Sequence, residues 1–136
     1  MYREPRVVKF VKAELTKDGA KCHAKVELNR SEGRSYFGSA EGACDGPEGL
    51  RAVAQACANA LLQAAAAGGD PSLFEIRVTA VAVQAAFGKE TVLVSVSGTY
   101  FKQRRDLLGL CVIDGDPIRS AALAVLNATN RFLGVG

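Results

Sequence analysis

The segment over residues 21 to 29 alternates strictly between apolar and polar side chains. Such alternation is typical of a β-strand with one buried and one solvated face. The step Asp18-Gly19 is a strong hairpin signal and joins this strand to another, expected over about residues 6 to 16. A third strand is expected over about residues 34 to 44. The predicted buried face carries Cys22, Ala24, Val26 and Leu28.

A helical pattern follows the third strand. Pro47 suits the first turn of a helix, because its missing N–H would have no partner there. The pair Gly68-Gly69 ends the pattern, and residues 70 to 72 form the expected linker. Apolar side chains recur at helical spacing in between, at Leu50, Val53, Ala54, Cys57, Leu61 and Ala64.

The second half repeats this order of elements. A helix is predicted from about Pro117 to Leu133, with Asp116 as its N-cap and Gly134 at its end. The three strands before it are expected over about residues 74 to 86, 90 to 101 and 106 to 113.

The two halves align without a gap at a spacing of 68 residues, so that residues 11 to 28 match residues 79 to 96. We therefore expect a single domain over residues 1 to 136, made of two repeats at about 6 to 69 and 73 to 134. The predicted fold class is α+β, with two pseudo-symmetric βββα units packed as one two-layer domain. The helices align at Arg51/Arg119, Ala54/Ala122, Ala56/Ala124, Asn59/Asn127 and Ala60/Ala128.

The composition is that of an ordinary globular chain, with 49% hydrophobic and 23% charged residues. No apolar run reaches the length of a membrane span, and the first residues lack the apolar core of a signal peptide, so the cytoplasm is the expected location. The alanine-rich helices allow close packing, and a bare apolar face on so small a unit favours a homodimer.

Cysteines and the single histidine predict neither a metal site nor a cofactor. Cys22, Cys44, Cys57 and Cys111 form no CxxC pair, and His23 alone cannot complete a zinc site. We expect free, mostly buried thiols in a reducing compartment.

The net charge of +3 is concentrated near the N-terminus. Residues 1 to 34 hold nine lysines and arginines against five acidic residues, and a second basic cluster lies at residues 101 to 106. A solvated strand face with lysines at a sheet edge is the favoured interpretation. Nucleic-acid binding is the less favoured one.

The two strand-to-helix junctions are the candidate binding positions. Backbone N–H groups at a helix start can hold a carboxylate or a phosphate. Acid–base catalysis by the aspartates is less favoured than helix capping, and no nucleophile accompanies His23, so we do not expect an enzyme. The candidate residues are Gly42, Asp45 and Gly46 in the first junction, and Gly109, Asp114, Gly115, Asp116 and Ile118 in the second.

The same junctions carry a family resemblance. DPIRSAALAVLNATNR, residues 116 to 131, resembles the second helix in the C-terminal regulatory domain of 2-isopropylmalate synthase and its citramalate synthase relatives, which ends in L-N-A-x-N-R. CDGPEGL, residues 44 to 50, is similar to the G-N-G-P-V-D-A segment of that family, with Gly46 and Pro47 matching. The chain departs from the family where a Gly-x-Gly is reduced to Gly109 alone.

The resemblance implies a dimerising domain that binds leucine or isoleucine as a feedback inhibitor. The catalytic barrel of the synthases needs about 250 residues, which this chain does not contain. We expect a stand-alone, non-catalytic regulatory domain that binds a small amino acid or related carboxylate. The alternative is an oligomerisation module without such a ligand, docking to a partner enzyme. Asn127 and Asn130 have no assigned role at this point.

Overall fold

The two predicted βββα units are present. The computed structural model describes residues 8–30, 33–44, 48–67, 73–100 and 103–129. The fold is α+β, as predicted, and each unit has three strands followed by one helix. The first unit holds β1 (Val8–Asp18), β2 (Lys21–Arg30), β3 (Ser35–Ala43) and α1 (Glu48–Ala67). The second holds β4 (Leu73–Ala86), β5 (Lys89–Tyr100), β6 (Gln103–Val112) and α2 (Pro117–Thr129).

Each unit forms its own antiparallel three-stranded sheet. The strand orders are β1-β2-β3 and β4-β5-β6, so the middle strand of each sheet is the second strand of its unit. The predicted Asp18-Gly19 turn joins β1 to β2, and Gly19 has the positive φ of 63° that such a turn requires. β2 and β5 begin at Lys21 and Lys89, which are 68 residues apart as the alignment predicts.

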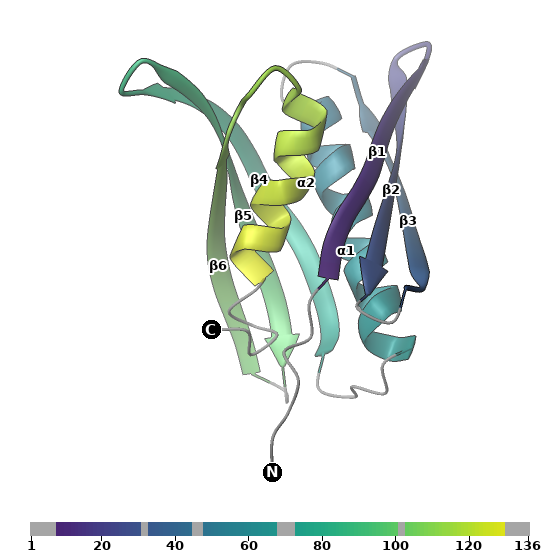
Figure 1. The fold of residues 1–136 in the computed structure, drawn as a ribbon. Coiled ribbons are helices and arrows are strands. Elements are labelled where there is room, and N and C mark those ends of the chain that lie inside the picture. Colours follow the sequence, from purple (N-terminus) through teal and green to yellow (C-terminus); the bar gives the residue numbers. More distant parts are fainter. Residues whose placement is uncertain (1–7, 31–32, 45–47, 68–72, 101–102, 130–136) are drawn as a thin grey trace.

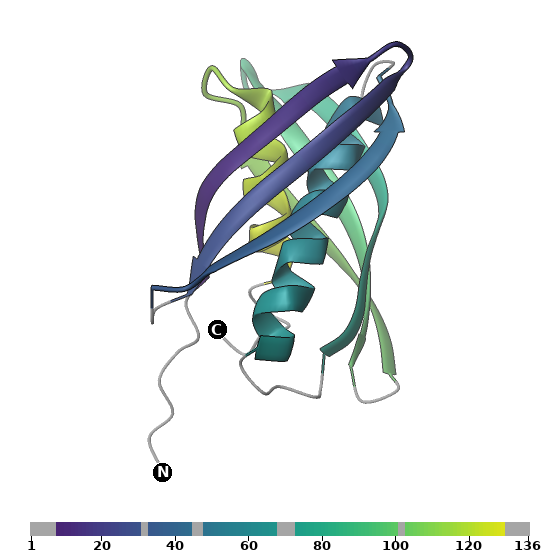
Figure 2. The same ribbon diagram turned by 90° about the vertical axis from the view of Figure 1, so that its right-hand side faces the viewer.

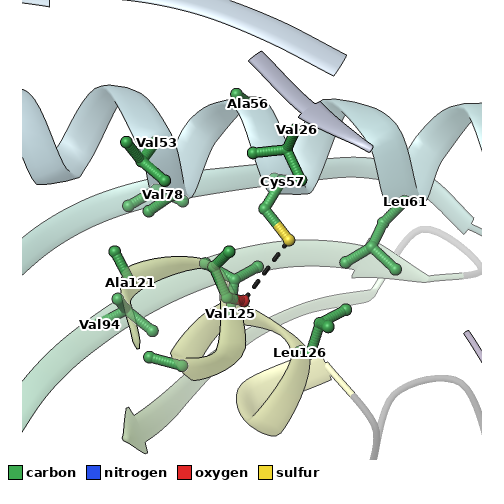
Figure 3. Packing of buried hydrophobic residues seen from close by; sticks show 14 of the residues in the cluster. Val26, Val53, Ala56, Cys57, Leu61, Val78, Val94, Ala121, Val125 and Leu126 are labelled. Atoms are coloured by element: carbon green, nitrogen blue, oxygen red, sulfur yellow. Dashed lines mark hydrogen bonds between the residues drawn. The ribbon is translucent and has the colours of Figure 1, made fainter. Parts of the chain in front are cut away.

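The two helices lie side by side between the two sheets (Figure 1), and the first sheet crosses in front of both of them in Figure 2. Each unit is thus a sheet and a helix, and the helices meet as a shared middle layer. The two units therefore pack in three layers, with a sheet on either side of the helices, and not in the two layers predicted. The Cys57 thiol on α1 donates a hydrogen bond of 3.5 Å to the carbonyl oxygen of Ala122 on α2 (Figure 3). Contact with both sheets and with α2 explains why α1 is buried around most of its circumference, at Ala52, Val53, Ala54, Ala56, Cys57, Ala58, Ala60 and Leu61.

The helix backbones touch an edge strand at a glycine in both units. A Cβ atom added at Gly38 on β3 would overlap the Ala56 carbonyl oxygen and the Ala60 amide nitrogen of α1. A Cβ atom added at Gly109 on β6 would overlap the Ala124 carbonyl oxygen of α2 in the same way. The strand and helix backbones are therefore as close as glycine allows.

An asparagine hydrogen bond follows each of these glycines. The Asn59 side chain donates to the Ser39 carbonyl oxygen at 2.8 Å, and the Leu110 N–H donates to the Asn127 side-chain oxygen at 3.2 Å. Each bond satisfies a backbone group on the outer strand of a sheet. This gives Asn127 a role that sequence alone did not supply, whereas Asn130 lies outside the described residues.

The expectation of four free thiols is wrong for two of them. Cys22 and Cys44 form a disulfide with their Cα atoms 5.2 Å apart. The sequence pattern placed each cysteine in a strand, but it did not show which residues of neighbouring strands lie opposite one another. The register sets Cys22 opposite Gly42, and the Cys44 N–H donates to the Ala20 carbonyl oxygen at 3.2 Å, which extends the ladder to the second cysteine. A reducing compartment was predicted from four free thiols, and these two cysteines no longer support that prediction.

Cys57 and Cys111 are free, as expected, and Cys57 is buried. Along the described segments, no helix is long and apolar enough to cross a membrane.

We predict that Gly38→Ala and Gly109→Ala each destabilise the fold. The added methyl group meets helix backbone, which cannot move aside as a side chain can, so a cost of about 1–3 kcal/mol or more is expected. Urea unfolding followed by circular dichroism measures it. Ser39→Ala is the control, because it keeps the carbonyl oxygen that Asn59 binds. Unchanged midpoints for both glycine variants would contradict the close approach.

We predict that Cys44→Ser lowers the free energy of unfolding by about 2–4 kcal/mol, since the disulfide closes a loop between residues 22 apart in sequence. A reducing agent should lower the melting temperature of the unaltered chain to a similar extent. Cys111→Ser serves as the control, because that thiol is free and only half-buried. A melting temperature that does not respond to the reductant would argue against the disulfide.

Candidate functional site

The main candidate site is a hollow at the seam between the two units. β3 and β4 are outer strands of different sheets, and α1 lies between them. The described polar side chains of α1 follow one stripe at four-residue steps, and this stripe is left uncovered between the strands. The hollow has a volume of about 370 Å³ and is lined by Glu41, Gly42, Arg51, Ala52, Gln55, Arg77 and Val78. We call it the seam hollow.

Charged groups in the seam hollow come from all three elements. Arg51 is on the first turns of α1, Arg77 is on β4, and Glu41 is on β3. Arg77 also pairs with Glu75 at 3.1 Å, and the Glu41 carboxylate lies 3.1 Å from the Nδ1 atom of His23. These pairs are partly exposed to solvent, so they leave the guanidinium and carboxylate groups accessible to a solute.

Gln55 on α1 bridges the seam to β4 with a hydrogen bond. Its side-chain oxygen accepts a hydrogen bond of 2.9 Å from the Val78 N–H, at the point where the β4–β5 register shifts between Val78 and Ala80. β4 is an outer strand, so backbone groups on its outward side have no strand partner, and here α1 supplies one. Of the lining residues, sequence reasoning named only Gly42 as a candidate, and it missed Glu41, Arg51, Gln55 and Arg77. The four-residue spacing of Arg51, Gln55 and Asn59 was the available signal for Gln55.

A second hollow follows the same stripe of α1 toward the helix C-terminus. It has a volume of about 500 Å³ and is lined by uncharged residues. Phe37, on its rim, is 48% exposed and lies 5.4 Å from the Lys25 ammonium group. Without charged groups or a buried polar side chain, this hollow offers less specific recognition than the seam hollow. Its lining is Phe37, Gly38, Ser39, Asn59, Leu62 and Gln63.

The second junction is organised around helix capping. One side-chain oxygen of Asp116 accepts hydrogen bonds from the Ile118 N–H at 3.0 Å and the Arg119 N–H at 3.3 Å. The N–H groups that a carboxylate ligand would use are therefore occupied by this side chain. Asp114 and Gly115 lie exposed in the turn before α2, and Ile118 is half-buried.

The predicted site residues are thus only partly brought together. Gly42 lines the seam hollow, whereas Gly109 is buried under α2 as part of the strand–helix contact. Asp45 and Gly46 lie outside the described residues. Arg119, which aligns with Arg51, lies over the Phe10 ring on β1, 5.9 Å from its centroid.

The described residues contain no cluster of three or more His, Cys, Asp or Glu side chains that could hold a metal ion. Burial raises the pKa of the Cys57 thiol to about 12, so this thiol is not a nucleophile near neutral pH. On β1, a 2.7 Å hydrogen bond between Lys12 and Glu14 raises the pKa of the Lys12 ammonium group and lowers the pKa of the Glu14 carboxyl group.

The chain matches no protein-family model and no curated protein in sequence. The likeness to the synthase regulatory domain therefore remains a prediction that rests on the residues quoted above.

We predict that Asp116→Ala destabilises the fold by about 1 kcal/mol, because two N–H groups at the start of α2 lose their acceptor. Asp116→Asn keeps an acceptor oxygen and should recover most of the loss. Chemical unfolding without any added ligand measures both variants. Equal stability of Asp116→Ala and the unaltered chain would show that capping is not the role of this residue.

Proposed function

We propose that this chain is a non-catalytic regulatory domain that binds a small amino acid in the seam hollow and works as a homodimer. The proposal of an amino-acid ligand rests on one observation, namely that two arginines line a single hollow of suitable size. Ligand sites commonly have volumes of about 300 to 1,000 Å³, and the seam hollow, at about 370 Å³, lies at the small end of that range.

The lining of the seam hollow matches the two charged groups of an amino acid. The guanidinium groups of Arg51 and Arg77 suit a carboxylate, to which arginine can donate two parallel hydrogen bonds. Glu41 suits the ammonium group. Ala52 and Val78, both almost fully buried, form the apolar floor of the hollow. Gly42 presents backbone without a side chain in the way.

The position of the seam hollow supports the resemblance stated above. Gly42 lies just before the first strand-to-helix junction, and Arg51 lies just after it. The synthase family is expected to receive leucine or isoleucine at this kind of junction. The departures in the second junction, where Asp116 caps the helix, favour the first junction as the binding one.

An interaction module without a small ligand is the second candidate function. Large apolar side chains on the second sheet support it, since Leu108 is 79% exposed and Leu110 is 54% exposed. Under this alternative the protein would dock to a partner enzyme or to itself, and the seam hollow would hold only water.

Calorimetry and thermal shift with leucine, isoleucine, valine and their keto acids test the ligand. Arg51→Gln should weaken amino-acid binding about tenfold or more, because it removes a charged donor to the carboxylate. Arg119→Gln is the matched control, since Arg119 aligns with Arg51 but lies over the Phe10 ring on β1. Equal binding by all three proteins, or no response from a folded chain to any of these compounds, would contradict the proposal.

The keto acids add a second comparison. They keep the carboxylate and the aliphatic side chain but lack the ammonium group that Glu41 is proposed to bind. We expect them to bind more weakly than the amino acids, and we expect Glu41→Gln to reduce that difference. A preference for keto acids would instead indicate that Glu41 does not contact the ligand.

A further inference from the structure

The outer faces of the two sheets differ sharply in chemistry, although the units share one fold. On the first sheet this face carries charged and paired side chains, including Lys12 with Glu14 and His23 with Glu41. On the second sheet a large part of the corresponding face carries apolar side chains. We call this part the outer patch; it consists of Ala80, Ala82, Leu93, Leu108, Leu110 and Val112.

The strand register assembles the outer patch from all three strands. Ala82, Leu93 and Leu110 form one row across β4, β5 and β6. The neighbouring row runs from Ala80 on β4 through Ser95 on β5 to Leu108 on β6, and the Thr79 hydroxyl lies 3.0 Å from the Ser95 hydroxyl. These positions alternate with residues that face the helices, such as the buried Val92 and Val94 of β5. The patch is therefore a surface, apolar apart from Ser95, that the described residues leave uncovered.

Two charged rows border the outer patch at one end. One row runs from Arg77 on β4 through Ser97 to Asp106 on β6. The next runs from Glu75 on β4 through Thr99 to Arg104 on β6. The Arg104 guanidinium donates to the Ser97 hydroxyl at 3.0 Å, which places both side chains on this face. In each row, the charge on β4 is opposite to the charge on β6.

We propose that a second copy of this chain docks on the outer patch, face to face, about a twofold axis parallel to β5. Such an axis places β4 of one copy over β6 of the other. Glu75 of each copy then faces Arg104 of the other, and Arg77 faces Asp106. A twofold interface must be complementary to itself, and the two charged rows meet that condition. Binding to an unrelated protein would not require such self-complementarity, so the rows favour a second copy.

The whole outer face of the second sheet, charged rows included, just reaches the size of a small dimer interface. Three strands about 4.8 Å apart and about ten residues long, at about 3.4 Å per residue, present roughly 500 Å² of flat area per copy. The two faces together bury roughly 1,000 Å², the lower limit for specific interfaces. Sheets packed face to face keep their strands nearly aligned, which agrees with an axis along β5.

This inference rests on the dimeric part of the proposed function and is independent of the ligand in the seam hollow. Sedimentation velocity of the full chain over a range of micromolar concentrations tests it. We expect the unaltered chain to dimerise and Leu110→Asp to weaken dimerisation at least tenfold. Phe37→Asp is the matched control, because Phe37 is similarly exposed but lies on the first sheet, and it should stay dimeric. Circular dichroism melts confirm that all variants are folded.

The charged rows provide a test of the axis. Glu75→Lys and Arg104→Glu should each weaken the dimer, because each sets like charges against one another, and the two changes combined should restore it. An unaltered chain that stays monomeric at high micromolar concentration would overturn the proposal, whether or not it captures another protein. So would a dimer that survives Leu110→Asp but is lost in Phe37→Asp. Failure of the combined charge variant to recover would overturn the twofold arrangement.

Discussion

The close approach of each helix to an edge strand is the contact on which the rest of the fold depends. A helix placed between two sheets has neighbours on nearly all sides, so large side chains would hold the layers apart. Alanine on the helices and glycine at Gly38 and Gly109 bring backbone against backbone instead. Asn59 and Asn127 then bind strand backbone groups beside those glycines, which keeps the tight contact from leaving polar groups unsatisfied.

Embedding the helices restricts where recognition can occur. Each helix keeps one uncovered stripe, and each stripe lies between outer strands of different sheets. On α1 the stripe carries polar groups beside Arg77 and Glu41, which produces a charged hollow. On α2 the aligned arginine, Arg119, lies against Phe10. The duplicated fold therefore keeps two similar cores while its surfaces have diverged.

Local sequence patterns predicted the parts of this structure that local interactions determine. Two-residue alternation located β2, the Asp18-Gly19 step located the first hairpin, and the 68-residue spacing identified the repeat. The Cys22–Cys44 disulfide was missed because it depends on register between strands. The equivalence of Gly38 and Gly109 was hidden because they are 71 residues apart while the helices are 68 apart. The seam hollow was only partly foreseen, through Gly42, because Arg51 and Arg77 meet across two units.

The β4 strand connects the two proposed activities. Its Val78 N–H is held by Gln55 at the seam hollow, and Ala80, on the other side of the register shift, belongs to the outer patch. Arg77 lines the hollow and also stands in a charged row beside that patch. If the proposed ligand draws the Arg77 guanidinium toward its carboxylate, it would change the charge presented to a second copy. Linkage requires the reverse effect to be equal in free energy, so dimerisation would alter ligand affinity by the same factor. The proposed regulatory function needs coupling of this kind, and β4 is the strand that would supply it.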